Sequence, residues 1–127
     1  MYRRVLLIDD EPTFLRSLAL YLEDAGHQVL TQTDANLALE VLHTNQPDAV
    51  ICDLRMPGMG GIEFFHEMRK NPKWQAIPFI LLTGAMERTV LDHSAGCGIY
   101  RILGKPFDPE DLVAILNRED GSASMVS

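Results

Sequence analysis

Short apolar runs alternate with longer amphipathic stretches along almost the whole of this chain. The runs are rich in Val, Ile and Leu and lack regular polar alternation, which is typical of strands buried on both faces of a parallel sheet. Repeated strand–helix alternation predicts an open α/β sheet with helices on both faces. The predicted strands cover residues 5–8, 27–30, 49–52, 79–82 and 99–103, and the run at 27–30 is the weakest.

The stretches between the runs carry apolar residues at helical spacing, and helix-start signals support the same boundaries. Pro12 is expected to open the first helix, and Asp108 is expected to cap the last one, over 110–119, with Pro109 at its first position. The weakest predicted helix, 86–94, has little apolar surface to bury. The first apolar stripe consists of Phe14, Leu18, Tyr21, Leu22 and Ala25.

Length, charge and composition limit the number of domains and the classes of function that this chain can have. The 127 residues suffice for one domain with a hydrophobic core, expected over 1–119. Residues 120–127 are small and polar, and we expect a disordered tail or the start of a linker to an output domain that these residues do not include. A net charge of −7 argues against a nucleic-acid-binding surface. Without a membrane-length apolar stretch or a signal-peptide pattern, the expected location is cytoplasmic.

Three kinds of residue are interpreted as structural. Cys52 lies inside an apolar run, and neither it nor Cys97 has C-x-x-C spacing, which favours a reduced core thiol at Cys52. The four histidines, among them His27 and His43, lack metal-ligand spacing and are interpreted as surface or packing residues. Trp74, in the loop before the fourth strand, is expected to anchor packing at an edge.

Polar residues follow four of the predicted strands. The carboxyl ends of parallel strands meet at one edge of the sheet, where functional groups collect. Carboxylates gathered there repel one another, so one pKa rises unless a cation lies among them, and such oxygen-rich sites suit Mg²⁺. The residues at these strand ends are Asp9, Asp10 and Glu11, then Asp53, then Thr83 and Gly84, and last Lys105, Pro106 and Phe107.

Four motifs span these strand ends: I-D-D-E at 8–11, D-L-R-M-P-G-M-G-G at 53–61, L-T-G-A at 82–85 and G-K-P-F at 104–107. Together they resemble one known family, the response regulator receiver domains of two-component signalling. The resemblance implies a flavodoxin-like, doubly wound parallel sheet of five strands in the order 2-1-3-4-5. It implies a domain that accepts a phosphoryl group from a sensor histidine kinase or a phosphotransfer protein and relays the signal by a conformational change. Such a domain catalyses only its own phosphorylation and dephosphorylation.

The resemblance assigns an acceptor and a metal site. Asp53 matches the phosphoacceptor. Asp10 matches a direct ligand of Mg²⁺, or of Mn²⁺ in its place, and Asp9 matches its acidic partner. The metal is also expected to bind Asp53 itself and the backbone carbonyl of Arg55.

Further positions match residues that act on the phosphoryl group. Thr83 matches a hydroxyl that swings toward a phosphoryl oxygen, and Lys105 matches the lysine that pairs with the group. The bond between Lys105 and Pro106 is expected to be cis. Ile102 occupies a switch position that is often aromatic in the family, and Gly104 replaces a more usual hydroxyl residue, so both depart from the family's pattern.

Two positions are expected to set the lifetime of the phosphorylated state. Arg55 and Ala85 match the residues that flank the approach of the hydrolytic water. Ala85 has no group to orient a water, and Arg55 is long enough to lie across its path. Slow self-dephosphorylation is the prediction.

Alternative functions remain open at this point. A flavin-binding protein of the same fold would need a loop that cradles phosphate where this chain has Asp9, Asp10 and Glu11. An aspartate-nucleophile phosphohydrolase usually carries D-x-D, but Arg55 stands two residues after Asp53. A receiver fold that binds partners without being phosphorylated is the third alternative.

Overall fold

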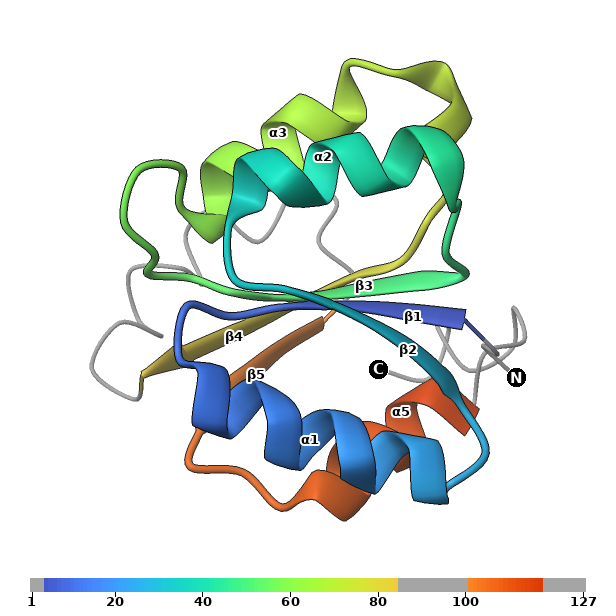
Figure 1. Ribbon diagram of the computed structural model, residues 1–127, viewed down its shortest axis with the longest axis vertical. Coiled ribbons are helices and arrows are strands. Elements are labelled where there is room, and N and C mark those ends of the chain that lie inside the picture. The colour runs from blue at the N-terminus through green and yellow to red at the C-terminus, as the bar shows by residue number, and fades with distance from the viewer. Residues whose placement is uncertain (1–3, 85–100, 118–127) are drawn as a thin grey trace.

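A computed structural model describes residues 4–84 and 101–117 of the protein. Within them, five parallel strands form one sheet in the order β2-β1-β3-β4-β5, which confirms the predicted strand order. Figure 1 shows the sheet between two layers of helices. The strands are β1 (Arg4–Ile8), β2 (Gln28–Gln32), β3 (Ala49–Asp53), β4 (Phe79–Gly84) and β5 (Arg101–Lys105).

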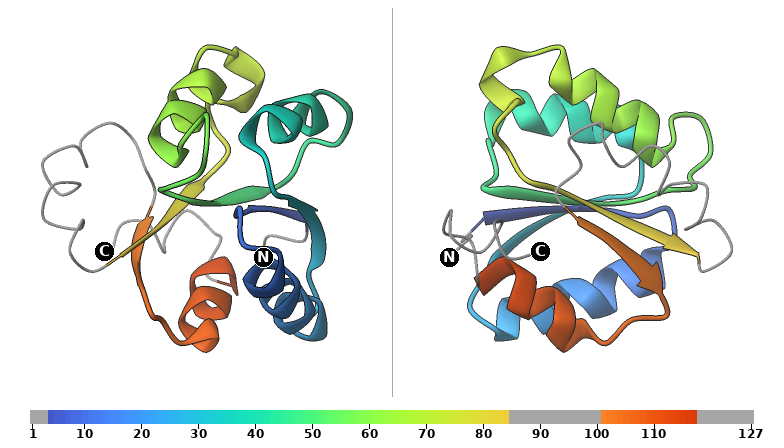
Figure 2. Two further views of the ribbon diagram at one scale, coloured as in Figure 1. Left: turned by 60° about the vertical axis from the view of Figure 1, so that its left-hand side comes forward. Right: turned by 180° about the vertical axis from the view of Figure 1, so that it is seen from behind.

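Helices cover both faces of the sheet, as predicted. One face is covered by α1 and α5, and the other by α2 and α3 (Figures 1 and 2). A short 3₁₀ helix, η1, lies between α3 and β4. The predicted helix at 86–94, Ala85 and the tail at 120–127 lie outside the described residues. The helices are α1 (Pro12–Asp24), α2 (Ala35–Thr44), α3 (Gly61–Arg69), η1 (Pro72–Trp74) and α5 (Pro109–Asn117).

The core consists of two apolar clusters, one on each face of the sheet. Alternate residues of β1, β3 and β4 point into opposite clusters, which explains why these strands are continuous apolar runs in the sequence. The cluster beneath α2 and α3 includes Leu6, Val50, Phe64, Phe65 and Leu81. The cluster beneath α1 and α5 includes Val5, Leu7, Leu18, Ile51 and Leu112.

Acidic side chains cap three of the helices. Asp108 caps α5 as predicted, its Oδ1 accepting a hydrogen bond from the backbone N–H of Glu110 at 2.9 Å. Asp34 caps α2, with its Oδ1 2.7 Å from the backbone nitrogen of Asn36. Glu11 caps α1, whose first residue is Pro12. The carboxylates satisfy amide groups that the first helical turn leaves unpaired.

The structure extends or refines several predictions. β5 runs to Lys105 rather than ending at residue 103, because Gly104 and Lys105 stay in register with Thr83 and Gly84 of β4. His27 is a packing residue, with only 3% of its surface exposed. No helix in the described ranges has both the length and the apolar composition needed to cross a membrane.

Trp74 was expected in a loop, but it ends the 3₁₀ helix η1 and is buried within the cluster beneath α2 and α3. Its indole also meets the imidazole of His43, with ring centroids 4.8 Å apart. A large aromatic surface is stabilised by burial, so the side chain packs inward where the sequence alone suggested an edge.

Candidate functional site

Parallel pairing brings the predicted site residues to one edge of the sheet. Ile8 of β1 is in register with Cys52 of β3, so the residues that follow, Asp9 and Asp53, are neighbours beyond these paired positions. Asp53 is in turn in register with Leu82 of β4, directly before Thr83. The sheet thus assembles the edge that the strand ends predicted.

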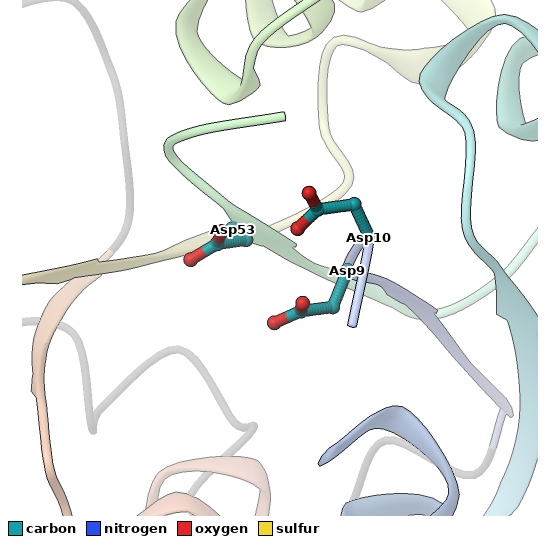
Figure 3. A group of neighbouring side chains, drawn as sticks. All are labelled: Asp9, Asp10 and Asp53. Atoms are coloured by element: carbon teal, nitrogen blue, oxygen red, sulfur yellow. The ribbon is translucent and has the colours of Figure 1, made fainter. Parts of the chain in front are cut away.

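Three carboxylates meet at this edge. One oxygen from each of Asp9, Asp10 and Asp53 lies within 4.8 Å of the others. Figure 3 shows the side chains extending from the ends of β1 and β3. Asp9 is 1% exposed and Asp53 9% exposed, whereas Asp10 faces solvent. Asp9 is also fixed by its own turn, since its Oδ1 accepts from the backbone N–H of Glu11 at 2.9 Å.

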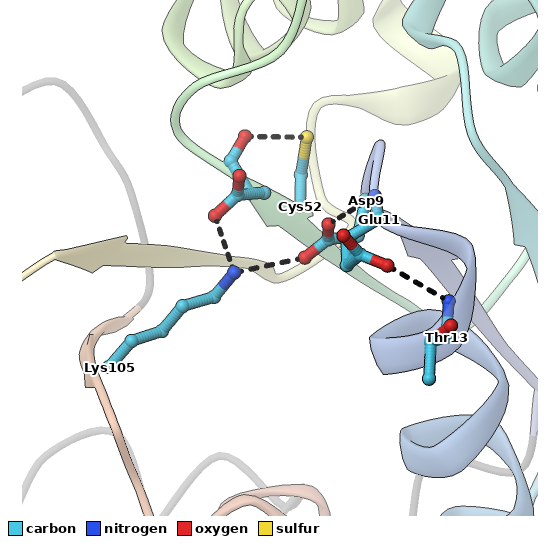
Figure 4. A network of polar contacts seen from close by, with 6 residues as sticks. Asp9, Glu11, Thr13, Cys52 and Lys105 are labelled. Atoms are coloured by element: carbon cyan, nitrogen blue, oxygen red, sulfur yellow. Dashed lines mark hydrogen bonds and ion pairs between the residues drawn. The ribbon is translucent and has the colours of Figure 1, made fainter.

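Lys105 reaches into the carboxylate cluster from β5. Its Nζ lies 3.0 Å from Oδ2 of Asp9 and 3.0 Å from Oδ1 of Asp53. Figure 4 shows the lysine side chain extending from its strand toward Asp9. The ammonium thereby bridges the two buried acids. The sequence predicted a lysine at the site but gave Asp9 only a metal-related role, so this direct pairing was missed.

The electrostatics of the cluster follow from burial and charge. Burial raises the pKa of Asp53; hydrogen bonding and charge attraction from Lys105 oppose the rise, and repulsion from Asp9 and Asp10 adds to it. Burial alone would lower the pKa of Lys105, but its hydrogen bonds to Asp53 and Asp9 outweigh that effect and raise it. The lysine therefore stays charged at neutral pH.

A thiol and a glycine fix the backbone around Asp53. Cys52 is buried with its Sγ 3.4 Å from the Asp53 carbonyl oxygen, and burial, then the charges of Asp53 and Asp9, raises the pKa of this thiol well above its usual range. A Cβ added at Gly61 would overlap that same carbonyl oxygen and come within 2.9 Å of Leu81 Cδ1. Only glycine lets α3 begin this close to the end of β3.

The remaining predicted residues occupy defined places. Thr83 is 1% exposed, and its hydroxyl donates to the Gly84 carbonyl oxygen at 3.2 Å. Ile102 is half-buried on β5, in register with Leu81, and packs against the cluster beneath α2 and α3. The peptide bond between Lys105 and Pro106 is cis, as predicted.

Arg55 and Asp10 line the same shallow cleft, together with the loop that follows β3. The Arg55 side chain is exposed. Ala85, the other position predicted to control the phosphoryl lifetime, lies outside the described residues.

One neighbour of the site was not predicted. Phe14 was assigned to the apolar stripe of the first helix, and its ring does face the core, but Lys105 Nζ also lies 4.4 Å from its centroid. The sequence did hold one signal for this contact: Phe14 follows the strand-end residues Asp9 to Glu11 within one helical turn, which places it close to the site. Periodicity identifies a buried face without revealing which distant side chain meets it.

Comparison with known proteins agrees with this geometry. A family model, the response regulator receiver domain, matches residues 5–117. The probable transcriptional regulator ycf29 of Cyanophora paradoxa is 37% identical over 88% of this chain and 53% of its own length. Response regulator Rre1 of Synechocystis is 35% identical over 88% of this chain and 49% of its own length. The chain thus spans about half the length of these two curated relatives.

Solved structures show the same likeness. The chemotaxis response regulator CheY4 of Vibrio cholerae superposes with a TM-score of 0.84 and 30% identity, covering 94% of this chain and 100% of that one. The family that the matching model describes is a signalling module rather than a conventional enzyme. The chain belongs to the response regulator receiver family of two-component signalling proteins.

Proposed function

We propose that Asp53 accepts a phosphoryl group from the phosphohistidine of a sensor histidine kinase or a phosphotransfer protein. The observation that carries this proposal is the Lys105 ammonium, 3.0 Å from a carboxylate oxygen of Asp53 and 3.0 Å from one of Asp9. It provides a positive charge beside a carboxylate that must approach an anionic donor. We assign this exchange to the cytoplasm, the location expected from the sequence.

The transfer is a displacement at phosphorus. A carboxylate oxygen of Asp53 attacks the phosphorus, the new O–P bond forms, and the P–N bond to the donor imidazole breaks with its electron pair returning to that nitrogen. Lys105 neutralises charge on the transferring oxygens. The Thr83 hydroxyl, which donates to the Gly84 carbonyl, exchanges that acceptor for a phosphoryl oxygen. Ile102, at the switch position, has no ring to reorient, so a relay through it would require repacking against the cluster beneath α2 and α3.

The three carboxylates also fit a hard divalent cation, since their oxygens lie within 4.8 Å of one another. Asp10, Asp53 and the backbone carbonyl of Arg55 would hold Mg²⁺, or Mn²⁺ in its place, with Asp9 as the acidic partner. Bound there, the metal would neutralise negative charge on the acceptor and on the phosphoryl oxygens. A cation held there would also offset the repulsion from Asp9 and Asp10, which adds to the effect of burial in raising the pKa of Asp53.

The assignment of Asp53 is tested by mass spectrometry. Incubation with phosphoramidate and Mg²⁺ should add one phosphoryl group, which hydroxylamine removes, and Asp53→Asn should abolish the label. Asp10→Ala should weaken Mg²⁺ binding and slow the labelling. Asp24→Asn, an exposed acid at the end of α1, serves as the control and should label like the wild type. Undiminished label on the Asp53→Asn variant would reject the acceptor.

Arg55 and Ala85 are proposed to make the phosphorylated state long-lived. Neither residue acts as a base at neutral pH, and the exposed Arg55 side chain follows Asp53 by two positions, at the mouth of the site. Phosphate release should be timed for the wild type and for the double change Arg55→Asn with Ala85→Glu. We expect faster loss from the double variant, because both new side chains can orient a water. Equal rates would show that these positions do not set the lifetime.

A further inference from the structure

The Lys105 ammonium is contacted from three separate segments of the chain. Two contacts are the Asp9 and Asp53 carboxylates, each 3.0 Å from Nζ. The third is the ring of Phe14 on α1, whose centroid lies 4.4 Å from Nζ. A protonated lysine has three N–H groups and accepts no hydrogen bond, and the negative face of an aromatic ring attracts a cation at this distance. The ring therefore provides a third attractive contact to the ammonium, in addition to the two carboxylates.

The Phe14 ring is also held by apolar contacts that do not involve the Lys105 side chain. Phe14 is the third residue of α1 and is half-buried against the cluster beneath α1 and α5. The ring of Phe107 meets it edge to face, with centroids 6.2 Å apart and planes at 90°. Because Phe107 lies two residues after Lys105, the turn that carries the lysine also braces the ring.

The position of Lys105 in the sheet leaves its side chain weakly constrained, so a contact with the Phe14 ring would limit its movement. It ends the edge strand β5, its side chain is 30% exposed, and its four-carbon stem has many rotamers. When Asp53 is phosphorylated, negative charge moves from the carboxylate to the phosphoryl oxygens. A hydrogen bond is directional, whereas attraction to a ring face tolerates sliding, so the ammonium can follow the charge without leaving the ring.

We propose that Phe14 is a positioning residue for Lys105, holding the ammonium at the two acids and then at the phosphoryl group. This inference rests on the proposed function. A cation–π contact at a partly exposed site changes an equilibrium constant by roughly two- to fivefold. Phe14→Leu keeps apolar bulk and loses the ring face, whereas Phe14→Tyr keeps both.

Two measurements test the proposal. Calorimetry with beryllium trifluoride, a phosphoryl mimic, at saturating Mg²⁺ should show affinity about two- to fivefold lower in Phe14→Leu and unchanged in Phe14→Tyr. The phosphoramidate concentration for half-maximal labelling should rise by the same factor in Phe14→Leu, while Mg²⁺ affinity should not fall, because a less firmly held ammonium competes less with the metal. In NMR spectra, the Lys105 Cε protons should be displaced upfield by the ring current in the wild type and in Phe14→Tyr, and not in Phe14→Leu.

Val113→Ala controls for stability, because it removes apolar bulk from the same cluster on α5. Wild-type mimic affinity in Phe14→Leu, equal losses in the Leu and Tyr variants, or an equal loss in Val113→Ala would each overturn the proposal. Absence of the ring-current shift would overturn it as well. Failure of the wild type to accept label at Asp53 would reject the proposed function instead, and the NMR result would still decide whether Phe14 holds the lysine.

Discussion

The two sides of the acidic edge come from different parts of the sheet. Asp53 ends β3, a central strand whose five residues are all buried. Lys105 ends β5, which is paired with β4 alone among the described strands and whose five residues are all half-buried. The acids are therefore fixed by a backbone packed on both faces, whereas the lysine is located mainly by what its side chain touches. The acceptor side is rigid, and the charge-neutralising side is adaptable.

Removing the Lys105 ammonium should have the largest effect, and it should act on the rate of phosphorylation. Lys105→Gln should slow labelling by phosphoramidate roughly 100-fold, the usual scale for losing one group that stabilises developing charge. Mg²⁺ affinity should rise, because a competing cation has left Asp9 and Asp53. Lys73→Gln, at an exposed lysine in η1, is the matched control. Weaker Mg²⁺ binding in Lys105→Gln would mean that the acids depend on the lysine for their positions. The central strands would then not be enough to hold the acceptor side in place.

A glycine substitution tests the rigidity of the acceptor side. Gly61→Ala should lower the free energy of unfolding by about 2–3 kcal/mol, because its Cβ overlaps the Asp53 carbonyl and a central strand cannot move away. Gly58→Ala is the comparison, since φ there is +78° and no atom lies within 4 Å of the added Cβ. That change should cost about 1 kcal/mol of backbone strain. Equal costs in urea unfolding would show that the end of β3 yields readily.

Removing the acceptor charge should have the smallest effect on stability. Burial, with repulsion from Asp9 and Asp10, raises the pKa of Asp53 in the folded protein, so folding penalises the ionised side chain relative to a neutral one. Without Mg²⁺ at pH 7, Asp53→Asn should increase the free energy of unfolding by an amount of order 1 kcal/mol. The difference should shrink as the pH falls and Asp53 takes up its proton. A destabilised Asn variant in EDTA would mean that the bond to Lys105 outweighs both burial and repulsion.

The sequence contained most of the fold because three central strands are buried on both faces and so appear as unbroken apolar runs. β2 was the weakest prediction, since it lies at an edge and its residues are only partly buried. The strand-end residues were predictable because parallel pairing brings them to one edge. The bridge from Lys105 to Asp9 and the ring of Phe14 were not, because both depend on how side chains from distant elements pack together.

The position of Trp74 determines what intrinsic fluorescence can measure in this protein. The chain has one tryptophan, and it precedes β4, whereas Asp53 is level with Leu82 toward the other end of that strand. The stretch of β4 from Phe79 to Leu82 alone spans roughly 10 Å. Intrinsic fluorescence is therefore an optical probe of unfolding that the chemistry at Asp53 does not touch directly. Any change of emission on phosphorylation, with the protein still folded, would record motion transmitted from the site to the region where β4 begins.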